Sequence, residues 1–381
     1  MLLILSSVGF IPLIPQNVIY IIYPLAFIVF FLHVAISNIK VSANLLIFFL
    51  LSAIAALMPV IYTDVEMIKL ILVFTLPFLL FTLGSSINIS GERLINILKS
   101  VYWVNIVVYL VFFFLLPVYA QTDSGGWIVS QSNSLISLLT KRIGGLQGNA
   151  NIAGAFIGLI SIVLISNISS SFKEKAVYFF ITAAVLIVFF KSRSAMLAFF
   201  ISIFVYIFQT YTKKNIFTIL IFLILPIMTM LLVLIDRELL DVFFRFESLL
   251  NDEHNSLSNR VVVNQDAIRI LINEFLLFGG GVTNETRLLE EFGDSRVYVE
   301  STYIKVLLER GVVGFSLFML ILYSVIKKYH LRLYSAASLL IIFVLINSIL
   351  EAVFGMLPLV NFMFLLLGLV INYHKVPENY R

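Results

Sequence analysis

The sequence contains no cysteine and very little charge. Without cysteine the chain cannot form a disulfide, a zinc–thiolate site or an iron–sulfur cluster, and it has no thiol nucleophile. Only 12% of its 381 residues are charged, whereas 61% are hydrophobic and the mean hydropathy is +1.07. A soluble domain carries about twice this share of charge. The composition therefore predicts a polytopic membrane protein.

Histidine is also scarce, and the four histidines are scattered. His33, His330 and His374 lie near predicted cytoplasmic ends, while His254 stands alone in NDEHNS. We therefore expect no metal site and no cofactor. No P-loop, dinucleotide fingerprint or serine-hydrolase elbow is present. The net charge of +4 is typical of a membrane protein with basic cytoplasmic loops, so no nucleic-acid partner is expected.

Apolar runs of membrane-spanning length recur along the whole chain. A bilayer core about 30 Å thick is crossed by about 20 apolar residues in a helix, whereas a barrel would need short alternating segments. We expect an all-α bundle of about twelve transmembrane helices forming one integral membrane domain, residues 1–381. The predicted spans are Leu2–Ile14, Val18–Ile36, Leu45–Tyr62, Met67–Leu83, Val101–Ala120, Ile152–Ile168, Ala176–Phe190, Ala195–Thr210, Ile216–Ile235, Val312–Ile326, Ser335–Leu350 and Val353–Ile371.

The distribution of lysine and arginine predicts the orientation of these spans. One set of alternate loops, with the C-terminal tail, holds most of the basic residues and is therefore expected to be cytoplasmic: Lys40, Arg93, Lys99, Lys173, Lys175, Lys213, Lys214, Lys327, Lys328, Arg332, Lys375 and Arg381. The opposite short loops hold few apart from Lys69, Lys191 and Arg193. The stretch FFKSRSAML thus lies at the outer edge, where the charge bias does not explain its two cations.

Two long hydrophilic segments also fall on the outer side, residues 121–151 and residues 236–310. Long irregular loops in a compact domain are usually functional. Within the second, VVNQDAIRILINEFLLF repeats its apolar residues at helical spacing, and DSRVYVESTYIKVLLERG has the pattern of a helix start. We expect two large outer loops, the second forming a partly helical cap.

Three arginines on this outer side are candidates for binding an anion: Arg142, Arg193 and Arg260. Arginine stays charged and offers a planar fork of donors that suits phosphate oxygens. Because a charge at membrane depth is costly, such a residue is a candidate for function. The alternative for Arg193 is that its side chain reaches out to lipid headgroup phosphates.

Two glycine-containing stretches accompany the arginines. GGLQGNANIAG, Gly144–Gly154, places Asn149 and Asn151 at the mouth of a span, where amides could bind a hydroxyl-rich ligand. The alternative is a loop followed by close helix packing through small residues. LFGGGV, Leu277–Val282, is consistent with an anion-binding nest of amides or, more simply, with a turn.

The returning stretch VYVESTYIKVLLERGVVGF carries a carboxylate, Glu300, at the start of a predicted helix. Glu300 either complements the positive helix end or acts as a general base. Glu309 beside Arg310 has the simpler interpretation of an ion pair.

In their order, GNANIAG, SRSA, SNR, FGGG and ESTYIKVLLERGVVG resemble the Wzy-type O-antigen polymerase and O-antigen ligase superfamily, over about Gly144–Phe315. The resemblance implies a membrane glycosyltransferase that takes a glycan from an undecaprenyl-diphosphate carrier at the periplasmic face of the inner membrane. It also implies that Arg193 and Arg260 handle the diphosphate. Ligases typically have a histidine, often followed by asparagine, where this chain has Glu300 and Ser301.

These observations combine into one hypothesis for the site. A leaving diphosphate needs cationic stabilisation, and a carboxylate assists an attacking sugar hydroxyl. We assign Arg193, Arg260 and Glu300 to catalysis, and we assign diphosphate or glycan binding to a second set: Arg142, Lys191, Asn149, Asn151 and Tyr303. The predicted reaction joins lipid-linked repeat units into O-antigen, capsule or exopolysaccharide.

Three alternatives stay open. The chain could be an O-antigen ligase that transfers the glycan to lipid A-core, a flippase or other transporter of lipid-linked oligosaccharide, or a scaffold without catalysis. A transporter should carry polar residues deep in many spans, and these spans are mostly apolar. A flippase and a chain-length regulator are the partners that the resemblance implies, besides the lipid bilayer.

Overall fold

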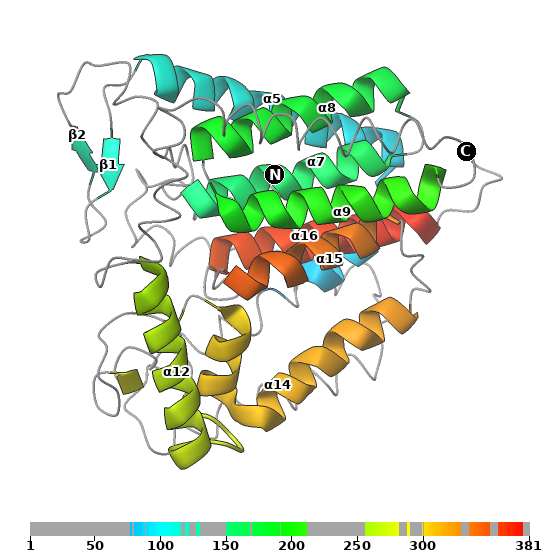
Figure 1. The fold of residues 1–381 in the computed structure, drawn as a ribbon. Coiled ribbons are helices and arrows are strands. Elements are labelled where there is room, and N and C mark those ends of the chain that lie inside the picture. Colours follow the sequence, from blue (N-terminus) through cyan, green and yellow to red (C-terminus); the bar gives the residue numbers. More distant parts are fainter. Residues whose placement is uncertain are drawn as a thin grey trace.

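The computed structural model shows a helical protein (Figure 1). It describes residues 77, 80–87, 89–115, 119–121, 127–129, 150–167, 170–190, 192–211, 256–281, 288–289, 299, 301–328, 335–350 and 357–375. The all-α prediction is confirmed for these residues, apart from one short antiparallel pairing of strands β1 (Tyr119–Gln121) and β2 (Trp127–Val129). This pairing adjoins the first predicted outer loop and was not foreseen in the sequence.

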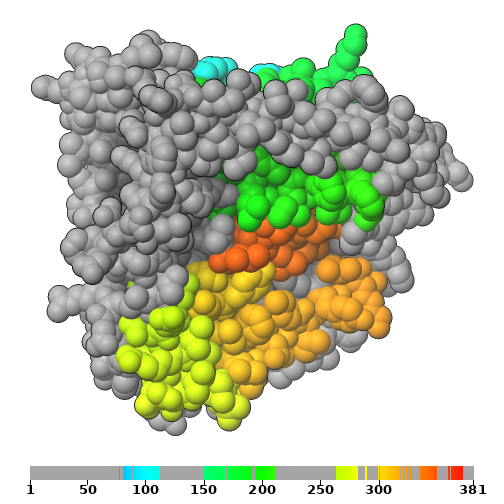
Figure 2. Space-filling view, in the orientation of Figure 1, coloured from blue at the N-terminus to red at the C-terminus, as the bar shows by residue number. Residues whose placement is uncertain are grey.

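The described helices form two groups, which lie one above the other in Figure 1. The larger group is a bundle of roughly aligned helices: α5 (Gly91–Leu115), α7 (Ala150–Ser166), α8 (Phe172–Ala184), η4 (Val185–Phe190), α9 (Arg193–Tyr211), α15 (Ala336–Leu350) and α16 (Leu357–Lys375). The smaller group contains α12 (Ser256–Glu274) and the first part of α14 (Thr302–Lys328). Figure 2 shows α15 at the surface between α9 and α14.

Helix α7 is the centre of the bundle. It is apolar on every side and contacts α5, α8, α9, α15 and α16. A helix that is hydrophobic all round is expected to be buried. Gly158 allows the closest approach, because a Cβ at this position would lie 2.7 Å from the ring of Phe343 on α15. Small residues on α7 therefore let the neighbouring helices pack against its backbone.

A buried network of hydroxyl groups ties α5, α7 and α8 together. The Oγ1 atom of Thr182 lies 3.0 Å from the hydroxyl of Tyr102 and 2.6 Å from Oγ of Ser161. Ser161 also donates to the carbonyl oxygen of Ile157 at 2.7 Å. Each of these polar side chains thus has a hydrogen-bond partner, as buried hydroxyls require.

Seven of the predicted spans coincide with described helices, namely those assigned to α5, α7, α8 with η4, α9, the second part of α14, α15 and α16. Within the part of the chain that the structure describes, Gly91–Val111 is long and apolar enough to cross a membrane, and Ala150–Ser166, Ser194–Thr210, Ala336–Ile349 and Phe362–Ile371 are shorter apolar helices. The predicted spans Leu2–Ile14, Val18–Ile36, Leu45–Tyr62 and Ile216–Ile235, and most of Met67–Leu83, lie outside the described residues.

Apolar side chains also cover the outside of the bundle. On α9, Leu197, Ile201, Phe204 and Phe208 recur at helical spacing and are 37–52% exposed. On α5, the valines at positions 104, 107 and 111 are 42–58% exposed. Contiguous exposed apolar surface of this kind marks an interaction surface, which in a membrane protein is the lipid-facing side.

The smaller group has its own hydrophobic core. Val263, Ala267 and Leu271 of α12 pack with Leu308 of α14 and with Val299. The helix predicted from VVNQDAIRILINEFLLF is confirmed as far as Glu274, after which residues 276–278 form a turn. This core accounts for the partly helical character predicted for the second loop. We call this group of α12, residues 275–281 and Thr302–Arg310 the cap.

An exchange of backbone hydrogen bonds joins the turn after α12 to both sides of a break in α14. Helix α14 breaks at Gly311, where φ is 63° and ψ is −171°. The amides of Gly280 and Gly281 donate to the carbonyls of Leu308 and Glu309 at 2.8 and 3.0 Å. In return, the amides of Val312 and Val313 donate to Leu276 and Leu277 at 2.9 and 3.1 Å. The helix ends on both sides of the break are thereby satisfied.

Glycine is required on both sides of this exchange. A Cβ at Gly279, where φ is 72°, would lie 2.3 Å from the amide nitrogen of Arg310, and a Cβ at Gly311 would lie 2.3 Å from the carbonyl oxygen of Leu277. Both obstacles are backbone atoms, so neither can move aside cheaply. The left-handed conformation adds a further cost for any other residue.

We expect Gly279→Ala to lower the free energy of unfolding by at least about 2 kcal/mol, because the strained backbone and the clash add together. Gly280→Ala is the matched control, since its Cβ would meet only the side chain of Leu288. Thermal unfolding of both variants in the same detergent checks the expectation. Equal losses in the two variants would contradict the requirement for glycine at position 279.

Candidate functional site

The starts of α7 and α9 meet at one end of the bundle. A Cβ on Gly154, in the first turns of α7, would lie 3.1 Å from Cβ of both Ser192 and Ala195. GNANIAG opens α7, and KSRSA leads into α9. Two motifs that are some forty residues apart in the sequence are therefore in contact. The structure thus brings the starts of these two helices together.

Ser192 caps the N-terminus of α9. Its carbonyl accepts from the amide of Met196 at 2.9 Å, and its buried hydroxyl lies 3.4 Å from that of Ser194. The residue thus occupies the N-cap position, and Arg193 is the first residue of the helix. A π-helix, η4, ends two residues before this cap. Such turns often occur at functional sites, and the sequence carried no signal for this one.

The position of Arg193 at a helix N-terminus is electrostatically unusual. The first turn of a helix presents amide N–H groups and a partial positive charge, so acidic residues are the favoured neighbours. An arginine there adds to the positive potential. The charge of Arg193 therefore does not stabilise the start of α9. It does make this helix end more favourable for a bound anion.

The start of α14 lies against the end of α15. The hydroxyl of Tyr303 donates to the carbonyl oxygen of Leu345 at 2.7 Å, and its ring packs edge-on against Phe315 with the centroids 6.3 Å apart. Burial raises the pKa of Tyr303, so this hydroxyl stays protonated and remains a donor at neutral pH. The contact ties the beginning of the cap segment Thr302–Arg310 to the last turns of α15.

Arg260 belongs to the N-terminal part of α12, one of the two helices of the cap. The end of α12 leads into the glycines that bond to Leu308 and Glu309, so the C-terminal ends of α12 and of Thr302–Arg310 lie together. The two helices pack side by side (Figure 1), which places Arg260 toward the start of α14.

Three charged residues follow one another along the first part of α14. Lys305 lies 3.7 Å from the carboxylate of Glu309, which is 4% exposed, so this carboxylate pairs with Lys305, a partner that was not predicted from the sequence. Arg310 is buried beside Glu309. Burial lowers the pKa of Arg310 to about 10, and Glu309 opposes this shift. Arg310 therefore remains positively charged at neutral pH.

The glycines of LFGGGV form the turn and not the nest. The amide of Gly279 donates to Phe275 at 2.9 Å, and those of Gly280 and Gly281 donate to α14. All three amides have acceptors within the protein, and none points to an anion. Of the two interpretations of this stretch, the structure supports the simpler one.

The structure describes the predicted site residues unequally. Asn151 is half-buried as the second residue of α7, and Tyr303 is half-buried as the second residue of α14. Arg193 and Arg260 are described by their helices only. Four further predicted residues lie outside the described residues: Glu300, Arg142, Lys191 and Asn149. Their assignment to the site stays a prediction.

Sequence reasoning overlooked Asn347 and Ser348, near the end of α15. Both are almost fully buried, at 2% and 1% exposure. Two consecutive polar residues within a predicted span were the available signal, because such residues are rare in membrane helices unless they serve a purpose. Within the described ranges, no group of three or more His, Cys, Asp or Glu side chains is placed to hold a metal ion.

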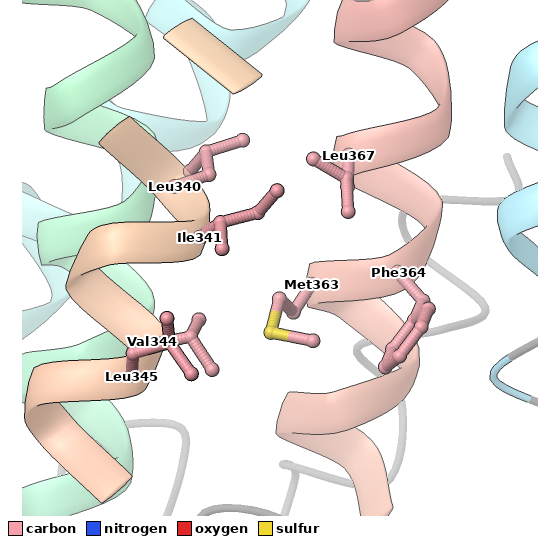
Figure 3. Close-up of a pocket in the computed structure, with 7 residues that line it drawn as sticks. All are labelled: Leu340, Ile341, Val344, Leu345, Met363, Phe364 and Leu367. Carbon is pink, nitrogen blue, oxygen red and sulfur yellow. The ribbon is translucent and has the colours of Figure 1, made fainter. Parts of the chain in front are cut away.

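A pocket between α15 and α16 has a different character. It is lined by Leu340, Ile341, Val344, Leu345, Met363, Phe364 and Leu367 (Figure 3). No nitrogen or oxygen of these side chains faces the space, because all of them are hydrocarbon or thioether groups. A site for a polar substrate needs polar groups that fix its orientation. This pocket is therefore part of the apolar packing.

Part of the chain matches the model of a known protein family. Residues 178–319 match the family model described as O-antigen ligase. The matched region begins in α8, includes KSRSA and α12, and ends within α14. No curated protein matches the chain.

We expect Tyr303→Phe to lower the free energy of unfolding by about 1 kcal/mol, because a half-buried hydrogen bond between the cap and α15 is lost. Tyr323→Phe on the same helix is the control, since Tyr323 is 58% exposed. Thermal unfolding in detergent compares the two. A Tyr303→Phe midpoint no lower than that of the control would show that the bond contributes nothing.

Proposed function

Because the chain belongs to the O-antigen polymerase and ligase superfamily, we propose that it is a glycosyltransferase that polymerises undecaprenyl-diphosphate-linked oligosaccharide repeat units. The product is O-antigen, capsular or exopolysaccharide. Proteins of this family are membrane enzymes of polysaccharide biosynthesis. The contact of Gly154 with Ser192 and Ala195 carries the proposal, since it joins the amide-rich start of α7 to the arginine-bearing start of α9.

The position of the site relative to the bilayer supports this chemistry. The diphosphate of a lipid carrier is held at the headgroup level, where the bundle helices begin and end. In our proposal this is the outer face of the cytoplasmic membrane, and residues 121–151 and 236–310 are outer loops of one membrane domain. The bias of lysine and arginine toward the opposite loops supports this orientation.

Arg193 and Arg260 are proposed to stabilise the leaving diphosphate. Arg193 stands at the first position of α9, where the amides of the first turn add to its charge. Arg260 belongs to α12 in the cap, so the two arginines are carried by different helices. Donors held in place before the reaction are the most effective form of electrostatic stabilisation. Arg142, Lys191, Asn149, Asn151 and Tyr303 are proposed to bind the diphosphate or the glycan.

The proposed step is a displacement at the anomeric carbon. An acceptor sugar hydroxyl forms the new C–O bond, and the bond between the anomeric carbon and the diphosphate oxygen breaks. The diphosphate leaves with the bonding electrons, and the hydroxyl proton passes to the Glu300 carboxylate. Glu300 immediately precedes the buried residues Ser301 and Thr302 at the start of α14.

The residue at position 300 is our reason for proposing polymerisation and not ligation. The resemblance described above associates the ligase reaction with a histidine before the Y-x-x-x-L-x-E-x-G run, and this chain has Glu300 there. We therefore propose the polymerase reaction and keep transfer to lipid A-core as the second candidate, because the matching family model is described as O-antigen ligase.

Purified protein in lipid nanodiscs should convert lipid-linked repeat units into a ladder of products spaced by one repeat. The substrate is extracted from cells that make the native repeat but lack this chain. We expect Arg193→Ala and Arg260→Ala to lower the rate by about 10²- to 10³-fold, the usual effect of removing one preorganised donor. Gel analysis of the products measures these rates.

Arg269→Ala is the matched control for these variants, because Arg269 lies on α12 with a side chain that is 52% exposed. Its rate should stay within about twofold of wild type. Ladders of normal rate from Arg193→Ala or Arg260→Ala would refute the diphosphate role. Absence of a ladder from the wild type, with transfer of the glycan to added lipid A-core, would establish the ligase instead.

We expect Glu300→Gln to slow polymerisation by about 10²- to 10⁴-fold, because the amide cannot accept the hydroxyl proton. A general base has a second signature: the rate of the wild type should fall at low pH as the carboxylate becomes protonated, whereas the residual rate of Glu300→Gln should not depend on pH in that range. A variant with the wild-type rate and pH profile would remove Glu300 from catalysis.

A further inference from the structure

Two buried polar groups near the end of α15 lack hydrogen bonds. In the part of the chain that the structure describes, Oδ1 of Asn347 and Oγ of Ser348 have no hydrogen-bond partner, although the residues are only 2% and 1% exposed. An acceptor that is buried without a donor costs free energy. This arrangement therefore needs an explanation.

Other buried polar groups of the bundle are satisfied. The amide nitrogen of Asn105 donates to Val101 at 2.8 Å, and its Oδ1 accepts from Tyr109 at 3.3 Å. Ser202 donates to Ala198 at 2.7 Å. The bundle therefore supplies partners for polar side chains elsewhere, and the end of α15 differs from the rest of the described bundle.

The packing of α7, α15 and α16 defines where Asn347 lies. The rings of Phe156 and Phe362, near the starts of α7 and α16, are 4.4 Å apart. Since α16 begins a few residues after α15 ends, the end of α15 lies at the start of α7. The two helices are thus antiparallel.

Asn347 belongs to the face of α15 that packs on α7. Phe343 of this face packs on Gly158. Asn347 is one helical turn after Phe343 on α15. Because α7 runs in the opposite direction, the residue of α7 at the same level is one turn before Gly158, which is Gly154. Asn151 continues the same face of α7, seven residues before Gly158. The interface between α7 and α15 therefore changes from apolar to polar toward the start of α7 and the end of α15.

The polar end of the interface between α7 and α15 lies next to the start of α9. Gly154, at the level of Asn347, is in contact with Ser192 and Ala195. Ser192 and Ser194 are buried, and they flank Arg193. Asn347 thus approaches the proposed diphosphate site from a third helix.

We propose that Asn347 is a further substrate-binding residue, which accepts a hydrogen bond from a hydroxyl of the lipid-linked glycan. The atom without a partner is a carbonyl oxygen, so it needs a donor. A sugar hydroxyl is a donor, whereas an ionised diphosphate offers only acceptors. The inference rests on the proposed function in one respect: it takes the ligand at this end to be a glycan next to a diphosphate.

Substitution by leucine separates a binding role from a structural one. Asn347→Leu removes the acceptor without a partner and nearly keeps the volume, so the thermal midpoint should stay equal or rise. Asn105→Leu is the matched control: it breaks two hydrogen bonds, and its midpoint should fall. Where leucine at position 347 prevents folding, Asn347→Ala supplies the variant for the binding measurement.

Two probes then test the ligand. One is the lipid-linked oligosaccharide extracted from cells that make the native repeat but lack this chain, and the other is undecaprenyl diphosphate without a sugar. We expect Asn347→Leu to bind the first about tenfold more weakly than wild type, and to bind the second with unchanged affinity. Microscale thermophoresis of protein in nanodiscs measures both.

The outcomes are distinct from those of the polymerase assay. Unchanged binding of both probes, or equal weakening of both, would overturn the role of Asn347 in holding the glycan. A selective loss for the glycan-bearing probe would support it even if wild-type protein forms no ladder. In that case polymerisation fails as the function, while the glycan site at the end of α15 remains.

Discussion

The break in α14 at Gly311 is the constraint on which the outer part of this structure depends. A helix that ends near the lipid surface leaves backbone carbonyls and amides that must find partners, and here they find them in residues 276–281. The partners are backbone groups, so the bonds require that two segments of the chain are in direct contact. Glycine at positions 279 and 311 makes that contact possible. The cap is consequently attached to the second part of α14 in one defined way.

This attachment has a consequence for the proposed chemistry. Because the glycine amides are used to hold the cap, they are not the groups that bind an anion. In our proposal the positive charge for a diphosphate comes from elsewhere, namely from Arg193 at the start of α9 and from Arg260 of α12. The structural and the electrostatic tasks are thus carried by different motifs, although both motifs belong to the region matched by the family model.

Polar groups inside the bundle divide into two kinds. The network of Tyr102, Ser161 and Thr182 is satisfied internally and joins three helices. The end of α15 is different, since Asn347 and Ser348 are buried without partners. Stability alone would favour apolar residues at these two positions. Functional sites are where such local conflicts are expected, because a ligand supplies the missing partner.

The order of the motifs along the chain and two of their helix starts could be predicted from the sequence. GNANIAG and KSRSA were each identified at a helix start, whereas the helix expected over residues 262–278 of the second loop overlaps α12 but is shifted toward the C-terminus at both ends. The contact between the two motifs, however, depends on Gly154 facing α9. For LFGGGV the sequence allowed either an anion-binding nest or a turn, and the hydrogen-bond partners of its amides decide for the turn. Asn347 was overlooked because its polarity is isolated within an apolar span.

By itself, the sequence indicated the membrane class of the protein, its helical character, the approximate positions of the described bundle helices and the order of the motifs. These properties follow from composition and from the spacing of apolar residues, which are local quantities. Only the tertiary structure decided which helix starts meet, which glycine amides are already used, and which face of α15 carries Asn347 against α7. These depend on contacts between residues that are distant in the chain, and local patterns do not specify such contacts.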